Sequence, residues 1–256
     1  MEALETLDAS GCESLTRISS SIGNLASMSR LDLVACQSLT EIPDSIGKLA
    51  SLNELRLAWT SITKLPESIG NLQNLRILDI RGIPVTELPS AIGMLAKLQV
   101  LSASCCCNLQ GLPNNIGELV SLNELYLGGS GILGLPESIS KLSSLQHLSV
   151  KFCENLRGIP EPPSSLTALH ITFPSPSLPF LSKLTLLEEL TLFDCRPLEC
   201  LPELPVRLSK VSLPSVNLSS EARLCQLIRD KSFRLRKATR CSHSAWVWSC
   251  TLYDIE

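Results

Sequence analysis

Few residue groups in this sequence have the spacing that catalysis or metal binding requires. His147 and His170 come closest to an acid–base or metal pair, but no carboxylate or cysteine completes a ligand set at the spacing of neighbouring strands. We therefore interpret both as solvated side chains. The 11 cysteines include no Cys-x-x-Cys pair and are interpreted as thiols. Gly47-Lys48 is followed by Leu49 and lacks the upstream glycine of a phosphate-binding loop. We predict no catalytic residue, no metal site, no cofactor and no enzymatic activity.

The chemistry that the sequence does offer is recognition, and a repeat positions it. Leucine supplies 50 of the 256 residues, which indicates a monotonous aliphatic core. A large apolar residue followed by apolar residues three and five positions later starts ten units, spaced 21 to 24 residues apart. The units start at Leu4, Met28, Leu52, Leu75, Leu98, Leu122, Leu145, Leu166, Leu187 and Leu208. This period and pattern are the signature of leucine-rich repeats.

Each unit contains a strand pattern followed by a turn pattern. In Leu52-x-x-Leu55-x-Leu57 the apolar residues alternate, which predicts a short strand with its leucines facing inward. The segment 65–72 places Pro66 in a first-turn position and Gly70 where a short helical turn would stop. Because one strand cannot bury its inner face alone, the units must stack. We predict an α/β leucine-rich repeat solenoid, a horseshoe with a curved parallel sheet on the concave face and short helical or 3-10 turns on the convex face.

The residue at each strand end takes two forms. Where it is cysteine, the next apolar residue is three positions on; otherwise it is two positions on. We expect this side chain to point into the stack, cysteine as a small hydrophobe and Thr60 or Ser130 as a hydroxyl for turn amides. The cysteines concerned are Cys12, Cys36, Cys106, Cys153 and Cys195.

Outward residues of the strands line up in rows across the predicted concave sheet. One row runs from Asp8 through Arg56 and Tyr126 to Ser212, and flanking rows carry further cations. Although aromatics make up only 4% of the chain, several fall at outward or strand-end positions, where a partner would touch them. We predict a partner-binding surface formed by Arg30, Arg56, Trp59, Arg81, Tyr126, His147, Lys151, Phe152, His170, Phe173 and Phe193. The alternative for the three phenylalanines is stacking across adjacent strands.

Composition and charge exclude several function classes. Net charge is −3 and charged residues make up 18% of the chain, so nucleic acid is not an expected partner. No apolar run is long enough for a membrane span. We divide the chain into a leucine-rich repeat domain of about ten repeats, residues 1–216, and a non-repeat basic tail, residues 217–256. The tail could be a nucleic-acid or membrane-surface patch, but we expect a weakly ordered end.

Several phrases resemble one family more than others. The units around Cys12, Gly70, Cys195 and Leu201 resemble the repeats of plant disease resistance proteins that carry a TIR domain and a nucleotide-binding module. The resemblance covers about residues 1 to 215. Neither upstream module is present in this chain, and the first strand has no polar cap before it, so we expect these residues to be part of a longer array.

The resemblance implies a function. It implies a protein-recognition module of plant innate immunity that binds a pathogen effector, a guarded host protein or the receptor's own nucleotide-binding module, and couples binding to signalling. It also implies a cytoplasmic location, with the nucleus as a second site. Two alternatives stay open: a free-standing signalling scaffold similar to plant Ras-group leucine-rich repeat proteins, and a truncated receptor fragment without independent activity. The sequence predicts no oligomeric state.

Overall fold

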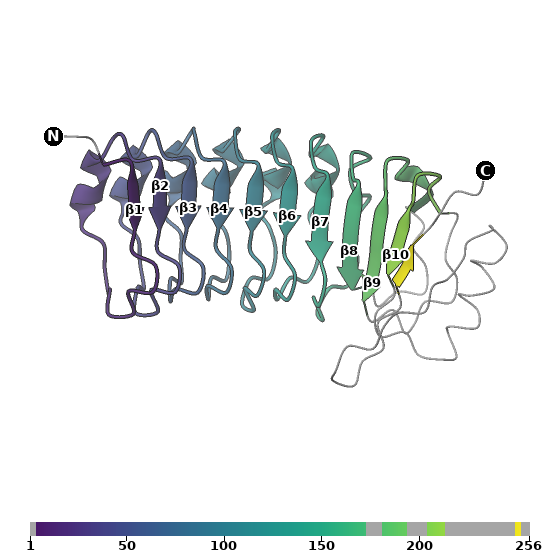
Figure 1. The fold of residues 1–256 in the computed structure, drawn as a ribbon, viewed down its shortest axis with the longest axis horizontal. Coiled ribbons are helices and arrows are strands. Elements are labelled where there is room, and N and C mark those ends of the chain that lie inside the picture. Colours follow the sequence, from purple (N-terminus) through teal and green to yellow (C-terminus); the bar gives the residue numbers. More distant parts are fainter. Residues whose placement is uncertain (1–3, 173–180, 194–203, 213–248, 252–256) are drawn as a thin grey trace.

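Short strands stacked in chain order form the frame of the protein (Figure 1). The computed structural model describes residues 4–172, 181–193, 204–212 and 249–251. Neighbouring strands in the sequence pair in parallel throughout β1 to β10. Their bounds are β1 (Thr6–Asp8), β2 (Arg30–Asp32), β3 (Glu54–Arg56), β4 (Ile77–Asp79), β5 (Val100–Ser102), β6 (Glu124–Tyr126), β7 (His147–Val150), β8 (Ala168–Thr172), β9 (Glu189–Phe193) and β10 (Lys210–Ser212). The predicted leucine-rich repeat solenoid is confirmed.

One further strand was not foreseen. β11 (Ser249–Thr251) pairs antiparallel with β10 and ends the sheet. It falls in the segment predicted to be a weakly ordered tail, whose residues 217–248 and 252–256 lie outside the described residues. No helix in the described part of the chain has the length and hydropathy of a membrane span.

The core contains a ladder of apolar residues in register across the strands, leucine in β1 to β9 and Val211 in β10. Leu55 of β3 is in register with Leu31 of β2 and Leu78 of β4, and all three side chains are fully buried. Leu7, whose strand β1 has a neighbour on one side only, is half-buried. Full burial of a leucine contributes about 1.5–3 kcal/mol, so each repeat gains stability from the repeats on both sides of it.

The convex side carries 3-10 helices, which have the same length in six consecutive repeats. They are η1 (Ser20–Asn24), η2 (Asp44–Lys48), η3 (Glu67–Asn71), η4 (Ser90–Met94), η5 (Asn114–Glu118) and η6 (Glu137–Lys141), and a shorter η7 (Leu181–Lys183) follows. Pro66 precedes η3 rather than standing in its first turn: it is the N-cap, with extended backbone at φ −72° and ψ 149°. Its fixed φ therefore sets the direction in which the chain enters the helix.

The glycine in these helices has a different role from the one expected. Gly70 lies inside η3, and the C-cap is Leu72, so the prediction that this glycine stops the turn is wrong. A β-carbon at Gly70 would lie 2.7 Å from the carbonyl oxygen of Ala91 in the next repeat, and one at Gly117 would lie 2.3 Å from that of Ser138. Glycine is present because successive helices pack backbone to backbone. In η6, where no helix follows before β8 among the described residues, the same position is the exposed Ser140.

This close contact predicts that Gly117→Ala destabilises the protein by about 1–3 kcal/mol, because the added methyl group overpacks the contact between η5 and η6. Gly111→Ala is the matched control, since a β-carbon at Gly111 would meet nothing within 4 Å. Urea unfolding followed by circular dichroism measures both variants. Equal unfolding free energies for the two would show that repeat spacing is not set by the glycine contact.

Three strand-end cysteines lie in the stack, as predicted. Cys36, Cys106 and Cys153 are buried, and each thiol donates to a carbonyl oxygen of the preceding repeat, at 3.1 Å for Cys36 to Ala9 and 3.2 Å for Cys153 to Leu127. Cys12, in the first repeat, is exposed, so the prediction is wrong for this cysteine, and Cys195 lies outside the described residues.

Thr60, at the same strand-end position, differs from the expectation. Its side chain is buried in the stack as expected, but its hydroxyl donates to the carbonyl oxygen of Leu57 at 2.8 Å, whereas we expected it to serve turn amides as an acceptor. The buried carbonyl of its own repeat lies three residues back and is the nearer partner, as is common for threonine at turns.

The run Cys105-Cys106-Cys107 therefore contains thiols in two environments. Burial raises the pKa of Cys106 to about 12, whereas its two neighbours are exposed. Because the thiolate is the reactive species, we expect iodoacetamide at pH 8 to modify Cys105 and Cys107 about a hundredfold faster than Cys106 in the folded protein. Mass spectrometry of the peptide that contains all three cysteines measures this ratio, and labelling in urea should abolish it. Equal native rates would contradict the buried position of Cys106.

Candidate functional site

The concave face presents the rows of side chains that the repeat period predicts. In the central row Asp32 is in register with Arg56, Arg56 with Asp79, and Ser102 with Tyr126. The row on the N-terminal side of the strands likewise continues from Arg30 to Lys210. Parallel strands in register therefore bring residues about 23 positions apart to within one strand spacing, roughly 4.8 Å.

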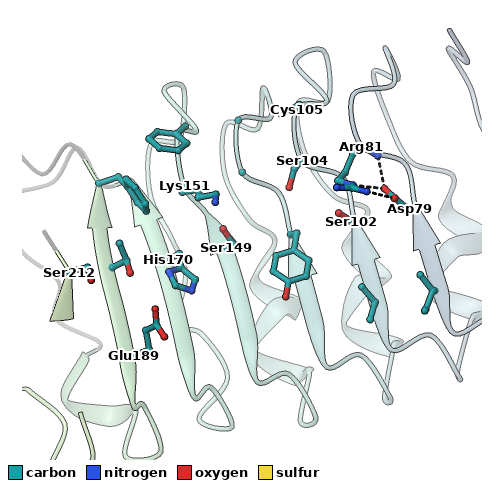
Figure 2. Close-up of a pocket in the computed structure, with 18 of the residues that line it drawn as sticks. Asp79, Arg81, Ser102, Ser104, Cys105, Ser149, Lys151, His170, Glu189 and Ser212 are labelled. Atoms are coloured by element: carbon teal, nitrogen blue, oxygen red, sulfur yellow. Dashed lines mark hydrogen bonds and ion pairs between the residues drawn. The ribbon is translucent and has the colours of Figure 1, made fainter. Parts of the chain in front are cut away.

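A groove of about 1040 Å³ runs along this face over strands β3 to β10 (Figure 2). Of the residues predicted to bind a partner, those that line it are Arg56, Trp59, Arg81, Tyr126, Lys151, Phe152, His170 and Phe193. Arg30 and His147 are on the same sheet, in β2 and β7, but do not line the groove. Phe173 lies outside the described residues.

Small residues form part of the groove lining that sequence reasoning did not select. Ser102, Ser104, Cys105 and Ser149 lie between the Arg81 and His170 ends in Figure 2, and Gly128 also lines the groove. Their row positions were readable from the period. The sequence alone gave no reason to assign these small residues to a binding site. Small residues form the floor of a groove only where larger side chains flank them, and that arrangement is visible only in the structure.

Most cations on this face are already neutralised. Arg30 lies 3.0 Å from a carboxylate oxygen of Asp32 and 3.3 Å from one of Glu54. Arg56 also pairs with Glu54. At the other end of the row that contains Arg30 and Glu54, Lys210 pairs with Glu189 at 2.8 Å. These side chains therefore offer a ligand less free charge than the sequence suggests.

Arg81 forms the most extensive of these pairs. Its Nε and Nη2 donate to the two carboxylate oxygens of Asp79 at 2.8 and 2.7 Å (Figure 2), and its backbone N–H donates to the same carboxylate at 3.2 Å. Asp79 is only 5% exposed, so the arginine satisfies an otherwise buried anion. The Asp79 hydrogen bond raises the pKa of Arg81 above its usual value.

Tyr126 and His170 are both uncharged at neutral pH. Burial, together with the hydrogen bond that the Tyr126 hydroxyl donates to Glu124 at 2.8 Å, raises the pKa of Tyr126 to about 12. Burial also lowers the pKa of His170 below its usual range, with Lys151 and Lys210 acting in the same direction and Glu189 opposing. Tyr126 therefore offers a ligand its ring rather than its hydroxyl, and His170 offers a neutral imidazole.

Aromatic side chains lie toward both ends of the groove. Phe152 and Phe193 pack together with ring centroids 4.6 Å apart and planes tilted by 58°. Phe152 follows β7 and Phe193 ends β9, so this pair packs across the intervening β8 and is not the predicted stacking on adjacent strands. Although it packs on Phe193, Phe152 remains 56% exposed and is therefore accessible to a partner. Trp59, at the other end, is 50% exposed. In the described residues no group of three or more His, Cys, Asp or Glu side chains is arranged to hold a metal ion.

The charge pairing predicts different outcomes for two groove cations. Arg81→Ala should lower the free energy of unfolding by about 1–3 kcal/mol, because it leaves the buried Asp79 carboxylate without its main donors. Lys151→Ala should change it by less than about 0.5 kcal/mol, because the Lys151 ammonium has no ion-pair partner among the described residues. Urea unfolding of both variants and of Arg81→Ala/Asp79→Ala, which should recover part of the loss, measures this. Equal stability of the two single variants would contradict a structural role for Arg81.

Comparison with known proteins gives consistent similarities. A family profile described as a leucine-rich repeat region matches residues 54–130. The leucine-rich repeat domain of the type III effector XopL is 32% identical over 66% of this chain and 68% of that chain, with a TM-score of 0.59. The plant peptide hormone receptor RGFR1, solved in complex with RGF2, is 28% identical over 82% of this chain, with a TM-score of 0.57. This chain spans 40% of that receptor chain. No curated protein matches the chain.

A more distant likeness concerns the fold alone. The Arabidopsis receptor kinase HAESA, solved with the peptide hormone IDA and the co-receptor SERK1, is 22% identical over 69% of this chain and 32% of that chain, with a TM-score of 0.54.

Proposed function

Because this chain belongs to the leucine-rich repeat proteins, we propose that it is a recognition module of plant innate immunity that binds protein partners through its concave groove. The observation that carries the proposal is the half-exposed state of Trp59 and Phe152 at a groove that also contains Tyr126. Large aromatic side chains beside cations are typical of residues that dominate binding energy at protein interfaces.

The class of partner follows from two similarities. RGFR1, a plant receptor with the same fold, was solved in complex with RGF2, which supports a polypeptide ligand for this groove. The phrase around Gly70 resembles repeats of plant intracellular disease resistance proteins. The proposed partners are a pathogen effector, a guarded host protein or a receptor's nucleotide-binding module, met in the cytoplasm, and binding is coupled to signalling. Repeats of this fold typically hold partners rather than catalyse reactions.

The test combines capture with matched surface variants. The purified chain is incubated with extract from infected plant tissue, and each captured protein is produced recombinantly and titrated by calorimetry. Trp59→Ala and Tyr126→Ala should each weaken the binding free energy of the true partner by more than about 1 kcal/mol, because each removes a large part of the groove's aromatic surface. Met94→Ser, at a 55% exposed position in η4 on the convex side, is the control and should leave affinity unchanged.

Two results would count against the proposal. A partner bound equally well by both groove variants but lost with Met94→Ser would move recognition to the convex side. Partners that are exclusively nucleic acids or small molecules would reject protein recognition itself. Circular dichroism of each variant separates loss of binding from loss of fold.

A further inference from the structure

One backbone position recurs in a left-handed conformation at the turn after the strand. It occurs in seven consecutive repeats, with φ between 58° and 74°, at Gly11, Ala35, Trp59, Gly82, Cys105, Gly129 and Phe152. This conformation is sterically unfavourable for side chains and is rare for bulky ones. Five of the seven repeats satisfy the turn with glycine, alanine or cysteine. The two with large aromatic residues therefore need another explanation.

Burial does not explain them. Trp59 and Phe152 keep about half of their surface exposed, 50% and 56%. Each ring is nevertheless held in place from one side. A β-carbon at Gly82 would lie 2.3 Å from Trp59 Cε3, so the indole lies against that glycine, and the Phe152 ring packs on Phe193. A fixed, unfavourably placed and exposed aromatic residue indicates a role outside the fold.

Between these two aromatic residues the same turn row contains only small residues. In the repeats of β4, β5 and β6 the left-handed position is occupied by Gly82, Cys105 and Gly129. Two of these residues, Cys105 and Gly129, also line the groove. The row therefore forms a shallow trough with an aromatic wall at each end. Strands β3 and β7 are four strand spacings apart, about 19 Å, which is the span of roughly six residues of extended peptide.

Charge distinguishes the two ends of the trough. Arg56 and Arg81, near Trp59, are paired with Glu54 and Asp79. Lys151, directly before Phe152, has no hydrogen bond or ion pair from its ammonium group to any described residue, and its stem lies over Gly128. Lys210 pairs with Glu189, and burial keeps His170 neutral. Among the described residues, the Phe152 end therefore carries a positive charge that no ion pair compensates.

From this geometry we propose that the groove takes an extended acidic peptide segment lying across the strands. One apolar side chain rests on Trp59, a second rests on the Phe152–Phe193 pair about six residues away, and a carboxylate beside the second pairs with Lys151. This inference rests on the proposed function, because it names the ligand class of the same groove. Glycine, serine and cysteine in the trough let the peptide backbone between the anchors lie close to the sheet.

A panel of fluorescein-labelled synthetic peptides tests the spacing. Each peptide carries two phenylalanines separated by a serine–threonine spacer that places the second two to nine residues after the first, in both chain directions. Asp stands beside one phenylalanine, and matched peptides carry Lys or Ser there. Fluorescence polarisation should give the tightest binding at five to seven residues, with the Asp peptide bound about tenfold tighter than the Lys peptide.

Variants test the assigned residues. Lys151→Glu should reverse the preference, so that the Lys peptide binds tighter than the Asp peptide. Trp59→Gly and Phe152→Gly should each weaken every peptide about tenfold and remove the spacing optimum. Because glycine suits the left-handed turn, their urea midpoints should not fall, which separates loss of an anchor from unfolding.

Two outcomes overturn the inference: affinity that does not depend on spacing, and an Asp preference that survives Lys151→Glu. Neither result alone rejects protein recognition by the groove. If a captured natural partner still loses affinity in Trp59→Ala and Tyr126→Ala, the proposed function stands and only the extended acidic ligand is wrong. If the affinity of the captured partner is also unchanged by Trp59→Ala and Tyr126→Ala, both proposals fail together.

Discussion

The structure depends on the fact that no single repeat can bury its own core. Strands β2, β3 and β4 each contribute one central leucine, Leu31, Leu55 and Leu78, and each of these is fully covered because strands lie on both sides of it. Stacking in register is therefore obligatory. The spacing of the stack is set on both faces: by strand hydrogen bonds on the concave side, and by backbone contact at glycines such as Gly70 and Gly117 on the convex side. Every feature of the groove follows from this forced alignment.

The sequence period was sufficient to predict which residues face outward and which rows they form. Leu55 alternates with Glu54 and Arg56, and a shift of 23 or 24 residues carries that alternation to the next strand, as the observed register from Arg56 to Asp79 confirms. The period could not reveal why Gly70 is glycine, because that reason is a contact with Ala91, 21 residues away on the convex side. A pattern within one repeat suggested a helix stop, which is a local explanation, whereas the actual constraint acts between repeats.

The state of the charged side chains could be predicted from the sequence pattern only in part. Arg30, Arg56 and Arg81 were chosen as partner-binding residues because they are cations in outward rows, but carboxylates on the same or adjacent strands pair with all three. Asp79 and Arg81 lie two residues apart, so in a strand they share a face, and the pairing could have been anticipated from alternation. The lack of an ion-pair partner for Lys151 could not be anticipated in this way. It depends on the absence, among the described residues, of a carboxylate within reach on the neighbouring strands.

The left-handed turn connects these observations. In the seven repeats where it is described, it allows the chain to reverse direction within a few residues after the strand, and five of them place glycine, alanine or cysteine there. Since Trp59 and Phe152 each keep about half of their surface exposed although each ring packs on one neighbour, the exposed half is best explained by what it presents to a partner. The small residues between the two rings have a role in the same explanation. Bulkier side chains at Gly82, Cys105 and Gly129 would interrupt the trough between Trp59 and Phe152. Selection for stability alone would favour uniform small residues at this position, and the departure from uniformity marks the surface where recognition is expected.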